Sequence, residues 1–437
     1  MRDIAFIGLM AIALIYALNK PWAGIMLWTV VSIMNPHKLT WAAADLPVGM
    51  ATAIVVLIGI LLSKEKLHFP LNAVTITQIV LILWMGLTTI TAANPTFAYP
   101  MADKVAKIQL MVLLTIAILQ SRKHLEMFIW VIVLSIGYYS VKGGVFTLLT
   151  GGIFRVWGPM GSFIQDNNAL ALAVIMTIPL MRYLQMVATN KWVRRGLTVA
   201  MVLSAASALG SHSRGALLAI AAMTLLLWWR SERKMLFGSL LVVLGVLLVA
   251  FMPGTWEERM GTISTYEQDA SARGRLNAWQ MCINVANDRI LGGGFDMYSV
   301  EMYALYAPVQ GIRLVAHSIY FQMLGEHGYI GLGIFLLLGG FGWRTAARLR
   351  KTAKAHPDFR WAGQLAGMCQ VSLVGYAVGG AFLSLAYFDL PYDLLAALVI
   401  AQRIVLREIE AKQAETGNAM QPAAAVPGPT LGRQGAR

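Results

Sequence analysis

The chain has 437 residues, of which 58% are hydrophobic and only 13% are charged, and its mean hydropathy is +0.64. This composition excludes an ordinary soluble domain and predicts an all-α polytopic membrane protein. The net charge of +14 does not argue for nucleic acid as a partner, because membrane proteins concentrate Lys and Arg in their cytoplasmic loops. We therefore expect membrane lipids, and no nucleic acid, around this chain.

Apolar runs follow one another along most of the chain. They lie at 4–18, 22–34, 47–62, 72–92, 104–119, 125–148, 166–187, 196–211, 215–229, 235–252, 317–340, 363–387 and 390–406. The first two are short, so we treat 4–34 as one interrupted unit, which gives twelve transmembrane helices with both ends inside. Two separate helices there would give thirteen. The first run lacks a convincing cleavage site, so we expect a retained helix rather than a signal peptide.

Clusters of Lys and Arg set the expected orientation. They lie at 63–68, 121–124, 190–195, 230–234 and 344–360. If all five clusters lie on the cytoplasmic side, the apolar runs between them cross the membrane in a consistent alternation. The segments then expected on the outer face are 93–103, 143–165, the 212–214 turn, 253–316 and 384–389.

Five regions follow from this pattern. They are an N-terminal transmembrane region (1–150), a transmembrane core with the Arg214 turn (151–252), a long external loop (253–316), the C-terminal transmembrane helices (317–406) and a cytoplasmic tail (407–437). The tail is rich in Ala, Pro, Gly and Gln and has no periodicity, so we expect it to be disordered.

The long external loop is predicted to fold. W-E-E-R-M, R-L-N-A-W-Q-M-C-I-N-V-A and Y-S-V-E-M-Y-A-L-Y have the pattern of amphipathic helices, and G-G-G at 292–294 interrupts them. We expect a helical cap over the membrane. Cys282 lies in this loop and Cys369 in an apolar run, so no disulfide between them is expected.

The stretch 316–338 combines a lone His317, Tyr320 and a carboxylate, Glu326, with an apolar run. Ionisable residues at the mouth of a membrane helix are functional candidates by default. The alternative is an interfacial His and a Glu that is satisfied inside the bundle. Glycines recur every third residue, at 325, 328 and 331, so a neighbouring helix could approach this face closely.

Arginines gather on the expected outer face. The long loop contains five arginines and no lysine, and Arg155 and Arg214 lie in two other outer turns. Arginine without lysine suggests bidentate recognition of phosphate or carboxylate. The alternative is structural pairing with the seven acids of the same loop, which is least expected for Arg214 because few acids are near it in sequence. The loop arginines are Arg259, Arg273, Arg275, Arg289 and Arg313; Trp279 lies one helical turn beyond Arg275.

The remaining polar groups give weaker signals. Asp166 is well placed as a helix N-cap, and Pro391 argues against a regular helix through Asp389 and Asp393. No zinc, nucleotide-binding or C-x-x-C motif is present, so we expect neither a metal site nor a cofactor. Arginines with a histidine can bind a diphosphate and deprotonate a hydroxyl, because imidazole has an unperturbed pKa of about 6.5.

The motifs S-H-S-R-G (211–215), R-G-R-L-N-A-W (273–279) and A-H-S-I-Y-F-Q-M-L-G-E-H-G-Y-I-G (316–331), with the long outer loop, resemble the O-antigen ligase and polymerase superfamily of bacterial inner membranes. The signature covers roughly 166–345, and the first 150 residues look like the extension of ligase-like proteins called O-glycosylation ligases. The resemblance is greatest to the ligase branch. It implies a metal-independent GT-C-type glycosyltransferase that passes a glycan from undecaprenyl diphosphate to a sugar hydroxyl of lipid A–core on the periplasmic side.

The resemblance also implies roles for individual residues. His317 matches the catalytic histidine, and Ser318 fits the residue after it. Arg214 and Arg275 match two donor-binding arginines. Arg155 is a weaker match and Arg273 matches by position alone; the secondary candidates are His212, Trp279, Tyr320 and Glu326.

Other functions stay open at this point. A polymerase or a protein O-oligosaccharyltransferase shares the same core motifs, and the acceptor is therefore unassigned. A transporter would place ionisable residues near mid-membrane in repeated halves, whereas these candidates gather at one face. A non-catalytic scaffold would give no reason for His317 and Arg214 to meet.

Overall fold

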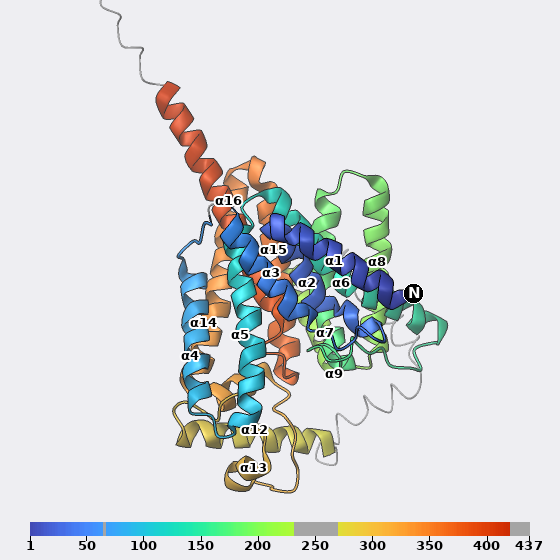
Figure 1. The fold of residues 1–437 in the computed structure, drawn as a ribbon, viewed down its shortest axis with the longest axis vertical. Coiled ribbons are helices and arrows are strands. Elements are labelled where there is room, and N and C mark those ends of the chain that lie inside the picture. The colour runs from blue at the N-terminus through green and yellow to red at the C-terminus, as the bar shows by residue number, and fades with distance from the viewer. Residues whose placement is uncertain (64–66, 231–269, 420–437) are drawn as a thin grey trace, which may run out of the picture.

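The computed structural model describes residues 1–63, 67–230 and 270–419, and these residues form helices and no strand (Figure 1). The helices are α1 (Arg2–Asn19), α2 (Pro21–Met34), η1 (Pro36–Leu39), α3 (Val48–Leu62), α4 (Ala73–Ile90), α5 (Pro95–Ile118), α6 (Arg122–Leu149), α7 (Asn167–Val187), α8 (Lys191–Gly210), α9 (Arg214–Arg230), α12 (Ala270–Asp288), α13 (Val300–Tyr306), α14 (Ile319–Ala355), η2 (Pro357–Phe359), α15 (Arg360–Gly379), η3 (Gly380–Phe382) and α16 (Asp389–Ala419). Each apolar run within the described residues is helical over most of its length, with 383–387 as a non-helical end of one run; the run 235–252 and the W-E-E-R-M segment lie outside the described residues.

Six helical segments among the described residues are long and apolar enough to cross a membrane. They are α1, α4, α6, α7, α14 and the segment Pro357–Phe382. The expected all-α polytopic membrane protein is thus confirmed, and the number of twelve spans stays a prediction. α7 is the most buried of the six, because α6, α8, α9 and α15 all pack against it.

Side-chain caps begin several of these helices. Asn72 accepts hydrogen bonds from the backbone of α4 and forms a capping box with Thr75. Asp166 accepts from the backbone N–H groups of Asn168 (2.9 Å) and Ala169 (3.4 Å), which confirms its predicted role as the N-cap of α7. Asp166 therefore fixes the direction in which the chain enters α7, and the candidate site described below lies at this end of the helix.

Residues 270–316, predicted to be part of an external loop, form a cap with its own core. α12 and α13 lie across one end of the bundle, while α16 extends from the opposite end (Figure 1). Gly292 and Gly294, in the break between the two helices, have positive φ angles of 70° and 81°. The predicted helices are confirmed within 270–316, whereas their place over the membrane stays a prediction; Cys282 and Cys369 are both buried and free. The core of the cap comprises Met281, Cys282, Val285, Met297, Met302, Tyr303 and Ala316.

The glycine row of α14 lets the cap approach closely. A Cβ at Gly325 would lie 2.8 Å from the Cys282 sulfur, and one at Gly328 would lie 2.2 Å from the Ile290 carbonyl. The predicted close approach is therefore present, with the cap as the neighbour. Gly328 has φ 69° and ψ −176°, so it also divides α14 into a short outer part and a long inner part.

Two expectations about α16 are wrong. Pro391 does not prevent a regular helix, because it is the third residue of α16, within the first turn, where a missing N–H costs nothing. Residues 407–419 are not disordered, since α16 continues to Ala419. This segment contains strong helix formers, and Lys412 pairs with Asp358 at 2.5 Å. Residues 420–437 lie outside the described part.

Candidate active site

His317 has a left-handed backbone conformation, with φ 45°, directly before α14. Its backbone N–H donates to the Ser384 hydroxyl at 2.8 Å. Ser318 caps α14 by accepting from the Phe321 N–H at 3.5 Å. A left-handed conformation is uncommon for a residue with a side chain and is often found at functional sites. The half-buried imidazole ring makes no hydrogen bond within the described part of the chain.

The electrostatic surroundings of His317 favour its neutral form. Burial lowers the pKa of the imidazole below its usual value, the positive charge of Arg275 lowers it further, and the negative charge of Asp166 opposes both effects. The structure therefore brings Arg275 of the cap and Asp166 of α7 within electrostatic reach of His317. A neutral imidazole at neutral pH can accept a proton from a hydroxyl group.

Arg214 lies on the other side of η3 from the His317 segment. The Asn167 amide donates to the Ser211 carbonyl at 2.6 Å, which ties the start of α7 to the turn before α9. A Cβ at Gly215 would be 3.5 Å from the Phe382 Cβ in η3. Ser384, which holds the His317 backbone, follows η3 by two residues.

The starts of α7, α9 and α14 are linked in this region: Asn167 bonds to the turn before α9, Asp166 acts on His317, and η3 contacts both α9 and α14. Each N-terminus carries the positive end of the helix dipole, and side-chain caps satisfy part of its first-turn backbone N–H groups. An anion between Arg214 and Arg275 would therefore also be stabilised by the backbone.

Trp279 joins the cap to the histidine segment. Its indole N–H donates to the Ala316 carbonyl at 2.7 Å, and its ring stacks on Phe321 with centroids 4.7 Å apart. Arg275, one helical turn earlier, is half-buried on the same helix, whereas Arg273 is exposed. The structure thus places Arg275 at the site and leaves Arg273 on the surface of the cap.

His212 has a positional role that its sequence context did not reveal. Its φ is 56°, and its buried ring donates from Nε2 to the Gly152 carbonyl at 2.6 Å. This bond anchors the turn that carries Arg155, whose side chain is exposed. The same His-Ser arrangement occurs before α14, where the His317 ring has no such partner among the described residues.

Glu326 lies away from the site. Its carboxylate is satisfied inside the bundle, which was the alternative to a functional role. The Glu326 carboxylate is buried and accepts from the Tyr387 hydroxyl. His327 Nε2 donates to the Tyr387 oxygen at 2.7 Å, and its Nδ1 is 2.7 Å from the Thr88 hydroxyl. This buried chain of hydrogen bonds joins α4, α14 and the segment before α16.

Comparison with known families decides the classification. Residues 199–336 match the family described as O-antigen ligase, and this match includes Arg214, Arg275 and His317. Residues 199–336 thus form a domain of the O-antigen ligase and polymerase superfamily. Residues 1–189 match a family of unknown function, DUF5935. No curated protein matches the chain.

Two of the remaining candidates, Tyr320 and Arg289, have structural contacts. Tyr320 donates to the Ala377 carbonyl at 2.7 Å. Arg289 donates to the carbonyls of Thr91 (2.8 Å) and Gly292 (3.0 Å), so it holds the glycine-rich break against the end of α4. Arg313 is exposed, and Arg259 lies outside the described residues.

Two contributors to the candidate site were missed in the sequence. Ser384 looked like an ordinary polar residue near the end of an apolar run, and nothing in the spacing linked it to His317. Asp166 was recognised only as a cap, because its electrostatic effect on His317 depends on the packing of α7 against α9. In the described ranges, no group of three His, Cys, Asp or Glu side chains is arranged to hold a metal ion.

Proposed function

We propose that this protein is an O-antigen ligase that transfers a glycan from undecaprenyl diphosphate to a sugar hydroxyl of lipid A–core, at the periplasmic face of the bacterial inner membrane. The observation that carries the proposal is the effect of Arg275 on the charge state of His317, next to η3, against which the start of α9 with Arg214 packs. The O-antigen ligase match supports the same chemistry, because it covers all three residues.

His317 is the general base of the proposed reaction. It accepts the proton of the acceptor hydroxyl while the oxygen attacks the anomeric carbon of the donor sugar. The new C–O bond forms as the bond to the diphosphate oxygen breaks, and undecaprenyl diphosphate leaves with the electron pair. His317 then returns the proton to solvent. General-base catalysis of this kind contributes a factor of about 10²–10⁴.

The donor diphosphate is held by Arg214 and Arg275, which stabilise the charge that develops on the leaving group. The helix N-termini contribute in the same direction. The guanidinium groups supply the positive charge, so the proposed reaction uses no metal ion, as the GT-C-type assignment implies. An apolar cavity of about 200 Å³, lined by Ile319, Tyr320 and Leu395 among others, lies behind the site and suits the polyprenyl chain of the donor.

One in-line displacement inverts the anomeric configuration. A covalent glycosyl-enzyme intermediate would need an available carboxylate, and the carboxylates of Asp166 and Glu326 both accept hydrogen bonds. Asp166 caps α7 and Glu326 accepts from Tyr387. Product with retained configuration, or a trapped glycosylated carboxylate, would contradict this mechanism.

The decisive experiment is glycan transfer by purified full-length protein, with a radiolabelled lipid-linked donor and lipid A–core as acceptor. His317→Ala is expected to reduce kcat by about 10²–10⁴-fold with donor binding retained. His356→Ala is the matched control, because His356 is exposed at the end of α14. Activity of His317→Ala within a few-fold of wild type would make His317 structural, and inhibition by EDTA would contradict a metal-free reaction.

A genetic test separates the ligase from its relatives in the superfamily. Cells without an active ligase accumulate lipid-linked polymer and display bare lipid A–core. Single repeat units joined to core would identify a polymerase instead. Loss of glycan from protein Ser or Thr, with lipopolysaccharide unchanged, would identify a protein O-oligosaccharyltransferase.

A further inference from the structure

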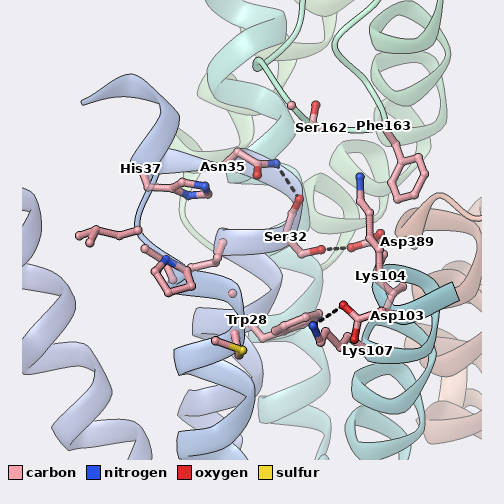
Figure 2. Close-up of a pocket in the computed structure, with 18 residues that line it drawn as sticks. Trp28, Ser32, Asn35, His37, Asp103, Lys104, Lys107, Ser162, Phe163 and Asp389 are labelled. Carbon is pink, nitrogen blue, oxygen red and sulfur yellow. Dashed lines mark hydrogen bonds and ion pairs between the residues drawn. The ribbon is translucent and has the colours of Figure 1, made fainter. Parts of the chain in front are cut away.

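A second polar cavity lies outside the residues that match the O-antigen ligase family. Its volume is about 310 Å³, and it is enclosed by the end of α2, η1, the start of α3, α5, the 161–163 loop and Asp389 (Figure 2). All of its lining residues except Asp389 fall within the match to the family of unknown function at 1–189. The volume is at the lower end of the range for small-molecule sites.

The charges around this cavity balance one another. Lys107 pairs with Asp103 at 2.5 Å, and the Ser32 hydroxyl donates to the Asp389 carboxylate. The Lys104 ammonium lies 3.9 Å from the centre of the Phe163 ring (Figure 2). Two lysines and two aspartates therefore line the cavity. A free anion would meet both carboxylates there, and a free cation would meet both ammonium groups.

The cavity is lined by hydrogen-bond donors, hydrogen-bond acceptors and apolar side chains. The ammonium groups donate and the carboxylates accept, while Trp28 and Phe163 contribute flat rings. Nδ1 of His37 is buried and has no hydrogen-bond partner among the described residues, so a ligand could satisfy it. A neutral ring with hydroxyl groups at its edge and C–H groups on its faces fits this combination.

Two segments connect the cavity to the active site. Phe163 precedes Asp166, the neighbour of His317, by three residues. Asp389 follows Ser384, which holds the His317 backbone, by five residues. Of the residues that line the cavity, Asp103, the 161–163 loop and Asp389 lie in segments of the predicted outer face. A glycan that reacts at His317 can therefore extend toward the cavity.

We propose that this cavity is a saccharide subsite, which holds a sugar residue of the donor or acceptor glycan away from the bond that forms. The inference rests on the proposed glycan transfer and adds a binding site in the N-terminal half of the chain. It predicts an effect on KM with little effect on kcat, because the cavity touches neither the diphosphate nor the reacting atoms.

The first test fills the cavity without removing a polar group. A Cβ at Gly49 would be 4.0 Å from both Trp28 and Val31, so Gly49→Leu places its side chain against the cavity wall without a backbone clash. Gly8→Leu is the matched control, since a Cβ there meets nothing within 4 Å. Gly49→Leu is expected to raise the KM for one glycan substrate about tenfold, with kcat within about twofold of wild type.

The second test removes one donor. Lys104→Met is expected to raise the same KM about tenfold, whereas Lys142→Met is expected to have no effect, because exposed Lys142 does not line the cavity. KM is measured separately for the lipid-linked donor and for the lipid A–core acceptor. A rise for the donor assigns the cavity to the donor glycan, and a rise for the acceptor assigns it to core sugars.

Three outcomes contradict the inference, and they are distinguishable. Unchanged KM values for both substrates in both variants would remove the saccharide subsite and leave the transferase intact. A loss of kcat alone would show that the cavity only supports the fold. Absence of transfer by the wild-type protein would overturn the proposed function and the subsite together.

Discussion

The indole of Trp279 donates a hydrogen bond to the carbonyl of Ala316, the residue directly before His317, at 2.7 Å. The cap therefore fixes the backbone that presents the histidine to the site. The stacking of Trp279 on Phe321 fixes the same segment one turn further on. In the proposed mechanism, the base His317 is therefore positioned by Trp279, a residue that does not touch the substrate.

Trp279→Phe tests this positioning. It keeps an aromatic ring to stack on Phe321 and removes the hydrogen bond to Ala316. We expect kcat to fall about ten- to a hundredfold, because small displacements of a reacting group are costly. Donor KM should stay within about twofold. Trp192→Phe, at an exposed position of α8, is the control. Equal kcat values for the two variants would show that the hydrogen bond is dispensable.

Arg214→Lys and Arg275→Lys keep the charge and lose the planar fork. If both arginines hold the diphosphate by paired hydrogen bonds, each variant should lose about ten- to a hundredfold in kcat/KM. The measurement is steady-state transfer from the lipid-linked donor. Arg344→Lys, at an exposed position near the inner end of α14, should be unaffected. Full activity of both site variants would mean that only net charge matters.

The pH profile reports the surroundings of His317. Its pKa lies below the usual value of about 6.5, so kcat/KM should hold below that pH and fall only when the pH drops through the lowered pKa. Asp166→Asn removes the charge that raises the pKa, so the acid limb should move to lower pH; asparagine still caps α7. Arg275→Met should move the limb to higher pH. Identical limbs in all three proteins would rule out His317 as the titrating base.

His327→Ala should affect stability instead of chemistry. His327 is fully buried, and its loss leaves a cavity and disrupts the hydrogen bonds to Thr88 and Tyr387. We expect a loss of about 2–4 kcal/mol in the free energy of unfolding. Thermal unfolding in lipid nanodiscs would show a lowered Tm, with kcat of the folded fraction nearly unchanged. His317→Ala should show the opposite pattern, and a shared pattern would contradict the separate roles.

The orientation of the site can be measured directly. Cysteines introduced at Ala270 and Val300 of the cap should react with a membrane-impermeant thiol reagent added from outside, whereas one at Thr352 should not. The native Cys282 and Cys369 are buried, so the introduced positions dominate the signal. Labelling of Thr352→Cys alone would place the cap in the cytoplasm and remove the periplasmic site.

The sequence by itself determined which segments become helices, because long apolar runs between basic clusters have few alternatives in a membrane. It also determined the folded cap, the Asp166 cap of α7 and the close approach at the glycines of α14. The local sequence led to two wrong predictions for α16, a break at Pro391 and disorder after residue 407. The helix forms because Pro391 lies within its first turn and because Lys412 contacts Asp358.

Only the tertiary structure decided which polar residues meet. Ser384 reaches His317 across 67 residues, and Thr88 reaches His327 across 239. Glu326 and His317 share one motif in the sequence, yet the first is satisfied by Tyr387 and the second borders Arg275. The spacing along the chain could not separate them, because a buried polar group takes whichever partner the packing of distant helices brings to it.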